Sequence, residues 1–251
     1  NTGTININAG TLGLSGTSSS GTIALVGTGL VFSGGTNSVT GLLNGTGALT
    51  FSGGTNTVTP AVGSTLTSPG TLTVSGGTSA VTMPAAWTPV TVSITGGTLD
   101  TGATSVTTSS WTQSNGTFNT AGTVTIPSGG AFNWSGGTLG GSGVITAAAG
   151  STTTLSGGAW KYLNDTVTLT NNGAMVFNGT TGIYAYNAGN KTINNAGSWD
   201  IQTDADTTFY LGTLTINNSG TITKSAGAAV SILNGLNNTG TVTVSSGTLQ
   251  L

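Results

Sequence analysis

Apolar and polar residues alternate along most of this 251-residue chain, with the period of two that is typical of β-strands. The segment Gly70–Thr78 (GTLTVSGGT) shows this clearly, because Leu72 and Val74 alternate with threonine and serine before a pair of glycines. Successive side chains of a strand point to opposite faces, so the pattern predicts a strand with one buried face. The glycine pair predicts the turn that follows it.

Variants of this phrase recur at a nearly constant spacing. The turn begins at Ser33, Ser52, Ser75, Thr95, Ser114, Ser135 and Ser156. Six steps cover the 123 residues from Ser33 to Ser156, so the mean spacing is 20.5 residues. A period of this length predicts an all-β solenoid, in which each coil buries its apolar face only against its neighbours. The chain has room for about twelve coils of roughly 19–24 residues each.

The positions three and one before each turn should face the same way in every coil. They are Leu30, Phe32, Leu49, Phe51, Leu72, Val74, Val92, Ile94, Trp111, Gln113, Phe132, Trp134, Thr153 and Leu155. Twelve of these fourteen residues are apolar, and only Gln113 and Thr153 break the pattern. The positions between them are mostly small or polar. We therefore expect two stacked apolar columns inside the solenoid and a small or polar face outside.

From about residue 165 the turn phrase changes from Ser-Gly-Gly-Thr to an Asn-Asn phrase that ends in glycine. We interpret residues 1–251 as a single elongated domain, with the first type of coil in 1–164 and the second in 165–251. Aligning the second type on its glycine stacks four asparagines, which we expect to form an internal amide ladder: Asn171, Asn195, Asn218 and Asn238. Lys224 falls where other coils have apolar residues, so we expect the strand to end before it or a bulge to turn it outward.

Charge is scarce, with three lysines, five aspartates, no arginine, glutamate, histidine or cysteine, and a net charge of −2. Because the chain has no basic patch, we expect no nucleic-acid partner. Without histidine or cysteine we expect no transition-metal site, and we expect no cofactor. Cysteine-free β-chains rich in threonine, serine, asparagine and glycine are common among secreted bacterial proteins, and no apolar run is long enough to span a membrane. The composition therefore predicts an extracellular protein without membrane insertion.

Several phrases resemble the passenger repeats of large bacterial surface adhesins, including autotransporter and filamentous-haemagglutinin-like proteins. They are GTLTVSGGT, GALTFSGGTNTVT, NNSGTIT and NNTGTVTVSSGTLQL, and the resemblance covers nearly the whole chain. It implies a right-handed parallel β-helix that is secreted and displayed at the cell surface, with a role in adhesion, biofilm formation or a stalk. Neither end of the sequence reads as a cap, which predicts flanking repeats of a larger chain or end-to-end self-assembly.

Some enzymes are built as parallel β-helices, and these need clustered carboxylates with basic partners. Here Asp100, Asp165 and Asp200 are scattered, whereas Asp204 and Asp206 would share one face of a strand. We expect no catalytic residue and a solvated role for all five aspartates. A weak calcium site at Asp204 and Asp206 is the alternative.

Aromatic residues fall into two groups. Trp111, Trp134 and Trp199 lie on inward columns and are expected in the core. By contrast, Tyr184 and Tyr186 flank Ala185 and are opposite in phase to Ile183, which predicts an exposed pair with Tyr210 or Trp160 nearby in a neighbouring coil. The candidate ligand patch, for cell-surface glycans, consists of Tyr184, Tyr186, Tyr210 and Trp160.

The sequence thus predicts a non-catalytic extracellular structural protein, a rigid shaft of an adhesin, stalk or self-assembling filament. One alternative is a glycan-binding or surface-binding adhesin module. Another is an ice-binding protein, because Thr-x-Thr phrases such as Thr71/Thr73 resemble the threonine rows of β-solenoid antifreeze proteins. Residues that interrupt the rows weigh against ice binding, and threonine is also simply a good strand former: Val31, Ala48, Ala131 and Asn133.

Overall fold

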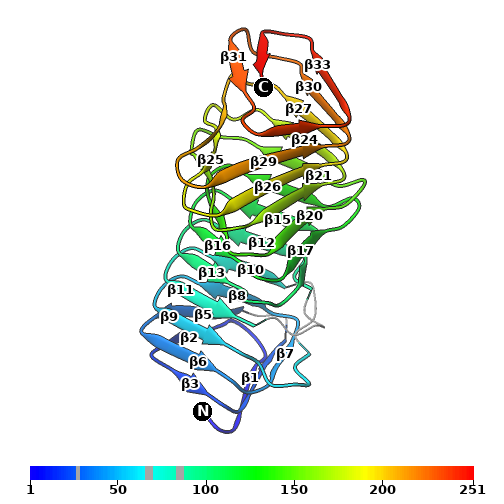
Figure 1. Cartoon of the computed structure of the whole chain (residues 1–251). Coiled ribbons are helices and arrows are strands. Elements are labelled where there is room, and N and C mark those ends of the chain that lie inside the picture. Colours follow the sequence, from blue (N-terminus) through cyan, green and yellow to red (C-terminus); the bar gives the residue numbers. More distant parts are fainter. Residues whose placement is uncertain (27–28, 66–69, 83–87) are drawn as a thin grey trace.

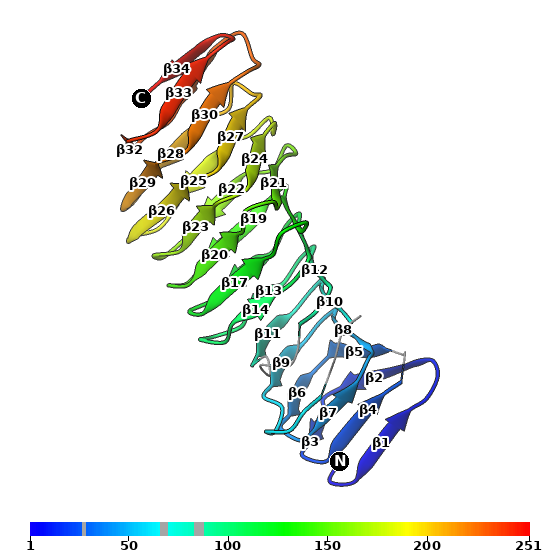
Figure 2. The ribbon, with the colours of Figure 1, turned by 90° about the vertical axis from the view of Figure 1, so that its right-hand side faces the viewer.

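The protein is a rod of stacked coils, with its two termini at opposite ends (Figure 1 and Figure 2). The computed structural model describes residues 1–26, 29–65, 70–82 and 88–251. These residues form parallel strands and no helix, in coils of about 21 residues that make about eleven turns. The predicted β-solenoid is therefore confirmed. The twelve strands of the longest sheet define eleven steps between neighbouring coils.

Three long sheets form the faces of the rod. The twelve-stranded sheet contains, in spatial order, β2 (Thr11–Ser15), β5 (Gly29–Gly34), β8 (Ala48–Phe51), β10 (Thr71–Val74), β12 (Thr91–Ile94), β15 (Ser110–Gln113), β18 (Ala131–Trp134), β21 (Thr152–Leu155), β24 (Ala174–Phe177), β27 (Ser198–Ile201), β30 (Thr221–Lys224) and β33 (Thr241–Val244). The ten-stranded sheet contains β3 (Ser18–Ser19), β6 (Thr36–Val39), β9 (Thr55–Val58), β11 (Thr78–Val81), β13 (Thr98–Asp100), β16 (Thr117–Asn119), β19 (Gly137–Gly140), β22 (Lys161–Leu163), β25 (Ile183–Ala185) and β28 (Thr207–Phe209).

The seven-stranded sheet contains β14 (Val106–Thr107), β17 (Thr123–Ile126), β20 (Val144–Ala147), β23 (Thr168–Asn171), β26 (Asn190–Asn195), β29 (Thr213–Asn218) and β32 (Leu236–Asn238). Two short sheets complete the strands, one of β1 (Thr4–Ile7), β4 (Thr22–Leu25) and β7 (Leu43–Gly45), the other of β31 (Val230–Ile232) and β34 (Thr248–Gln250). Neighbouring strands of a sheet are separated by about 4.8 Å, so eleven steps make the twelve-stranded sheet about 53 Å long.

Equivalent positions of successive coils lie directly beside one another. Leu72, for example, pairs with Leu49 on one side and with Val92 on the other, and all three are fully buried. The other predicted column residues, from Leu30 and Phe32 onward, are buried in the same way, as are Trp111, Trp134 and Trp199. The alternation in the sequence therefore sets which face of each strand enters the core.

The two polar residues in these columns also stay inside. Gln113 is buried, and its side-chain amide donates to the carbonyl oxygens of Thr138 (2.9 Å) and Gly116 (3.3 Å). Thr153 is buried between Phe132 and Met175 of the neighbouring strands. A polar interruption of the sequence pattern thus leaves the coil unchanged.

Asparagine ladders run along the core in two places. The predicted ladder exists: the amide nitrogen of Asn171 donates to Asn195, Asn195 to Asn218, and Asn218 to Asn238, over 2.7, 2.7 and 2.6 Å. A second ladder, which the sequence analysis missed, joins Asn37 to Asn56 (2.8 Å) and Asn56 to Ser79 (3.1 Å) inside the ten-stranded sheet. Asn195 and Asn218 each donate and accept within the ladder, so stacking satisfies their buried amides, whereas the side-chain oxygen of Asn171, at the end of the ladder, has no partner among the described residues.

In the first type of coil, the turn between the strand of the twelve-stranded sheet and that of the ten-stranded sheet contains a glycine with positive φ. Gly77 has a φ of +73°, in the region that side chains disfavour, and a Cβ there would collide with the carbonyl oxygen of Gly54 in the preceding coil. The recurring Gly-Gly pair of the sequence is therefore the result of close main-chain packing between successive turns.

Leu72→Lys should unfold or fray the rod, because it places an ammonium in the middle of an apolar column. The cost is expected to be about 4 kcal/mol or more, against less than about 1 kcal/mol for Thr73→Lys, whose side chain points outward on the same strand. Thermal unfolding followed by circular dichroism measures both. Equal melting temperatures for the two variants would contradict this register.

Asn195→Ala should destabilise the protein by about 1–3 kcal/mol, because it leaves the buried amide oxygen of Asn218 without its donor and removes one of the two acceptors of the Asn171 amide nitrogen, which keeps the Ser198 carbonyl. The neighbouring Asn194→Ala is the matched control, since Asn194 belongs to the exposed face and accepts only one side-chain bond, from Asn217. Denaturant unfolding of the two variants separates the buried ladder from the exposed one. A similar loss of unfolding free energy in both variants would mean that burial does not increase the contribution of an asparagine ladder to stability.

Candidate functional site

Five aromatic side chains, three exposed and two partly buried, form one continuous group on the outer face of the ten-stranded sheet and at the ends of its strands. This aromatic surface consists of Trp160, Tyr162, Tyr184, Tyr186 and Tyr210. Ring centroids are 5.6 Å apart for Trp160 and Tyr184, 5.9 Å for Tyr162 with both Tyr184 and Tyr186, 6.0 Å for Tyr184 and Tyr186, and 6.3 Å for Tyr186 and Tyr210. Trp160, Tyr186 and Tyr210 are 43%, 51% and 66% exposed. The surface therefore presents ring faces and edges from several neighbouring coils.

Strand register explains why these rings point outward. Tyr162 pairs with Tyr184 across β22 and β25, and both follow Thr138 in an outward column of threonines. Ile183 and Ala185, on either side of Tyr184, are fully buried, as the alternation predicts. Gly182 makes room for the indole, because a Cβ at this position would lie 3.1 Å from a ring carbon of Trp160.

Two surface hollows border the aromatic surface, and both are lined by Thr138 and Tyr162. The larger, of about 490 Å³, extends from Trp160 across the turns that contain Gly116, Gly137 and Gly158. The smaller, of about 280 Å³, is lined by Thr138, Tyr162, Asn164 and Tyr186. Because the lining consists of aromatic rings, hydroxyl groups, amides and main chain, it suits an uncharged ligand with many hydroxyl groups.

The structure brings the four residues of the candidate patch together. Trp160 and Tyr210 lie on opposite sides of the Tyr184 and Tyr186 pair. Sequence analysis missed Tyr162, which contacts both of these tyrosines. The signal was present, because Tyr162 lies 22 residues before Tyr184, which is one coil.

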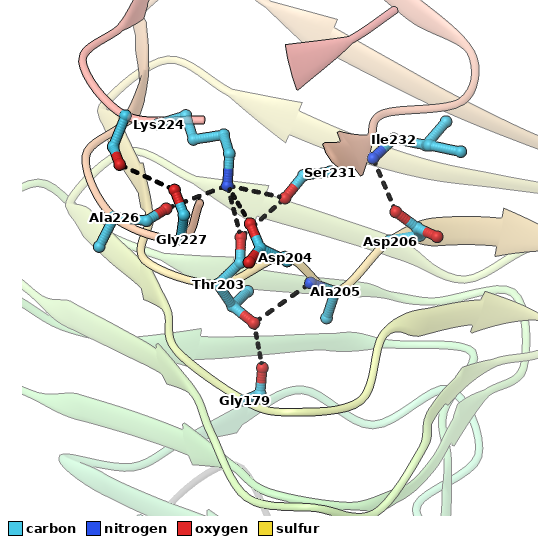
Figure 3. A network of polar contacts seen from close by, with 11 residues as sticks. Gly179, Thr203, Asp204, Ala205, Asp206, Lys224, Ala226, Gly227, Ser231 and Ile232 are labelled. Atoms are coloured by element: carbon cyan, nitrogen blue, oxygen red, sulfur yellow. Dashed lines mark hydrogen bonds and ion pairs between the residues drawn. The ribbon is translucent and has the colours of Figure 1, made fainter. Parts of the chain in front are cut away.

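All three lysines are buried inside the solenoid, so the expectation that the strand stops before Lys224 or that a bulge turns this residue outward is wrong. Lys224 is the last residue of β30, faces inward and is fully buried. Its ammonium donates to the carbonyl oxygens of Thr203 (2.9 Å) and Ala226 (3.0 Å), to Asp204 (2.9 Å) and to Ser231 (3.2 Å), as Figure 3 shows. Inward-facing turn carbonyls satisfy the ammonium, which sequence patterning does not reveal.

The aspartates do not form the pair that we considered. Asp204 forms the ion pair with Lys224, and this hydrogen bond holds the pKa of the carboxyl below its usual value. Asp206 instead accepts the main-chain N–H of Ile232 at 2.8 Å (Figure 3). Neither residue lies in a strand, so the shared strand face that we expected is wrong. Within the described residues no group of three or more acidic, histidine or cysteine side chains is placed to hold a metal ion.

Lys161 and Lys191 are held by main chain. The Lys191 ammonium donates to the carbonyl oxygens of Asn187, Ala188 (3.1 Å) and Gly189 (3.2 Å), and burial lowers its pKa while Asp165 opposes that shift. Lys161 has a single such bond, to Ala159 at 3.1 Å, and burial lowers its pKa to about 8. Of the three buried ammoniums, that of Lys161 is the least compensated.

Threonine rows are long but narrow. One outward column of the ten-stranded sheet contains six threonines in succession: Thr36, Thr55, Thr78, Thr98, Thr117 and Thr138. The adjacent outward column is mixed and includes Ala80, Asp100 and Gly140. Among the described strands, two neighbours with threonine at both outward positions occur only at β30 and β33. The broad threonine plane that would favour ice binding is not formed by these strands.

Comparison of the chain with protein-family models, with curated proteins and with solved structures gives no match. No helix in the described ranges is long and apolar enough to cross a membrane.

Lys161 should make stability depend on pH in the alkaline range. Its folded pKa of about 8 lies below the unfolded value of 10.5, so the unfolded chain binds the proton more tightly and stability rises as pH increases from about 8 to about 10.5. Between pH 7.5 and 9.5 the gain is expected to be about 2 kcal/mol. Denaturant titrations at these two pH values measure it. Lys161→Met should lose most of this rise, the remainder coming from Lys191, whose pKa is also lowered by burial. An equal rise in both proteins would contradict the assignment.

Proposed function

We propose that the chain is a non-catalytic structural protein, a rigid extracellular shaft of a cell-surface adhesin, stalk or filament. The observation that supports this most directly is the stack of twelve hydrogen-bonded parallel strands over a continuous buried core. Each coil is hydrogen-bonded to the next through several sheets, so bending the rod requires several ladders to separate together.

The distribution of polar chemistry agrees with a structural role. Acid/base catalysis needs a titratable group that can reach a substrate. Here the ammonium groups are engaged inside the rod, and the carboxylates of Asp204 and Asp206 are engaged by Lys224 and by main chain. The ladders of asparagine and of apolar residues extend along the rod axis, so each coil adds to one continuous core.

Electron microscopy of producing cells, with gold-labelled antibody against the folded domain, tests this proposal. We expect label outside the cell on straight rods or fibres. Label confined to the cell interior would overturn the extracellular placement, and flexible or compact purified particles would overturn the shaft.

An internal control exploits the repeat. Deleting residues 117–137 joins Gly116 to Thr138, which pairs with Thr117 in the intact chain, and so removes one coil in register. The shortened rod should fold and lose about 4.8 Å of length by small-angle X-ray scattering. Deleting residues 117–126 removes about half a coil, so the strands that follow no longer meet their partners in the same sheet. This variant should not fold cooperatively.

A further inference from the structure

We infer that the aromatic surface is a binding site for a neutral polysaccharide, which lies along the rod axis across successive coils. This inference does not rest on the structural role proposed above. It follows from the ring geometry, the unused hydrogen-bonding groups, the hollows and the distribution of charge.

The rings offer stacking platforms for sugars. Tyrosine and tryptophan combine an apolar face with a polar edge, which matches the apolar C–H face and hydroxyl rim of a sugar ring. Tyr186 lies at the centre, because it contacts Tyr162, Tyr184 and Tyr210. Trp160 extends the surface toward the larger hollow.

Polar groups that lack protein partners lie beside these rings. In the described part of the chain no protein group hydrogen-bonds the phenol hydroxyls of Tyr162, Tyr184, Tyr186 and Tyr210. Asn164 lines the smaller hollow, and its side-chain oxygen is buried without a hydrogen-bond partner among the described residues. The Asn164 oxygen is closed to solvent, so the hydroxyls that a ligand can reach are those of the exposed Tyr186 and Tyr210, which can both donate and accept.

The site is elongated along the axis. From Thr117 to Tyr210 it covers five consecutive coils, or about 19 Å at about 4.8 Å for each step. Glycines at successive turns leave a trench beside Trp160, where side chains would otherwise project. A chain of several sugar units fits this shape better than a single sugar does.

Charge selects a neutral polymer. The sequence contains three lysines and no arginine or histidine, and all three lysines are fully buried, so the surface presents no basic side chain. Uronate, sialate or sulfate groups would find no cationic partner, and the net charge of −2 would repel them weakly.

Affinity electrophoresis of the folded protein tests the inference. The gels would contain neutral polymers (mannan, xyloglucan, soluble β-glucan or hydroxyethylcellulose) or the acidic polymers polygalacturonate and heparin. We expect retardation by at least one neutral polymer and by neither acidic one. Tyr186→Ala should weaken binding about ten-fold and Trp160→Ala about three-fold to ten-fold, because each removes one platform.

Two controls separate binding from folding. Tyr186→Phe keeps the ring and should retain most of the affinity, whereas Thr215→Ala, on the seven-stranded sheet, should bind like the unmodified protein. All variants should keep the melting temperature within a few degrees. Failure of every neutral polymer, equal binding of heparin, or unchanged affinity in Tyr186→Ala would overturn the inference. So would concentration-dependent self-association in sedimentation that Tyr186→Ala removes, because the surface would then be an interface between copies.

Discussion

The parallel hydrogen-bond ladder between successive coils is the constraint on which the rest of this structure depends. It places each residue beside its equivalent one coil away, so side chains at equivalent positions stack on one another along the axis. Stacking like on like favours apolar side chains, and it favours asparagine, whose amide both donates and accepts. It is unfavourable for charge, because equal charges about 4.8 Å apart repel. The scarcity of charged residues and the isolation of each lysine within its column follow from this constraint.

The buried columns could be predicted because the sequence repeats with the same period as the coils. Leu72 and Val74 identify a buried face by alternation, and Asn171 and Asn195 by their shared distance from a glycine. The ladder of Asn37, Asn56 and Ser79 escaped prediction because its third member is not an asparagine. Similarity between repeats is visible in a sequence, whereas equivalence between different residue types requires the register.

The errors concern the inward-facing main chain. We did not expect Lys224 to be buried in an apolar column, because a buried charge needs partners. Turn carbonyls and Asp204 provide those partners for its ammonium. Alternation assigns a side chain to a face and says nothing about which carbonyls meet it there. For the same reason Asp204 and Asp206 were grouped by their spacing, although one lies against a lysine and the other caps a main-chain N–H. The aromatic patch was anticipated in part, because parity placed Tyr184 outside, but the place of Tyr162 needed the pairing of β22 with β25.

The burial of every lysine also determines how the rod responds to trypsin-like proteases. Trypsin-like enzymes cleave after lysine or arginine, and they need the flanking chain to leave its fold and enter the active-site cleft. In this chain the three target residues lie inside the coil, and arginine is absent. Such an enzyme therefore depends on local opening of a coil, and the resistance of the rod to it is set by the stability of the stack.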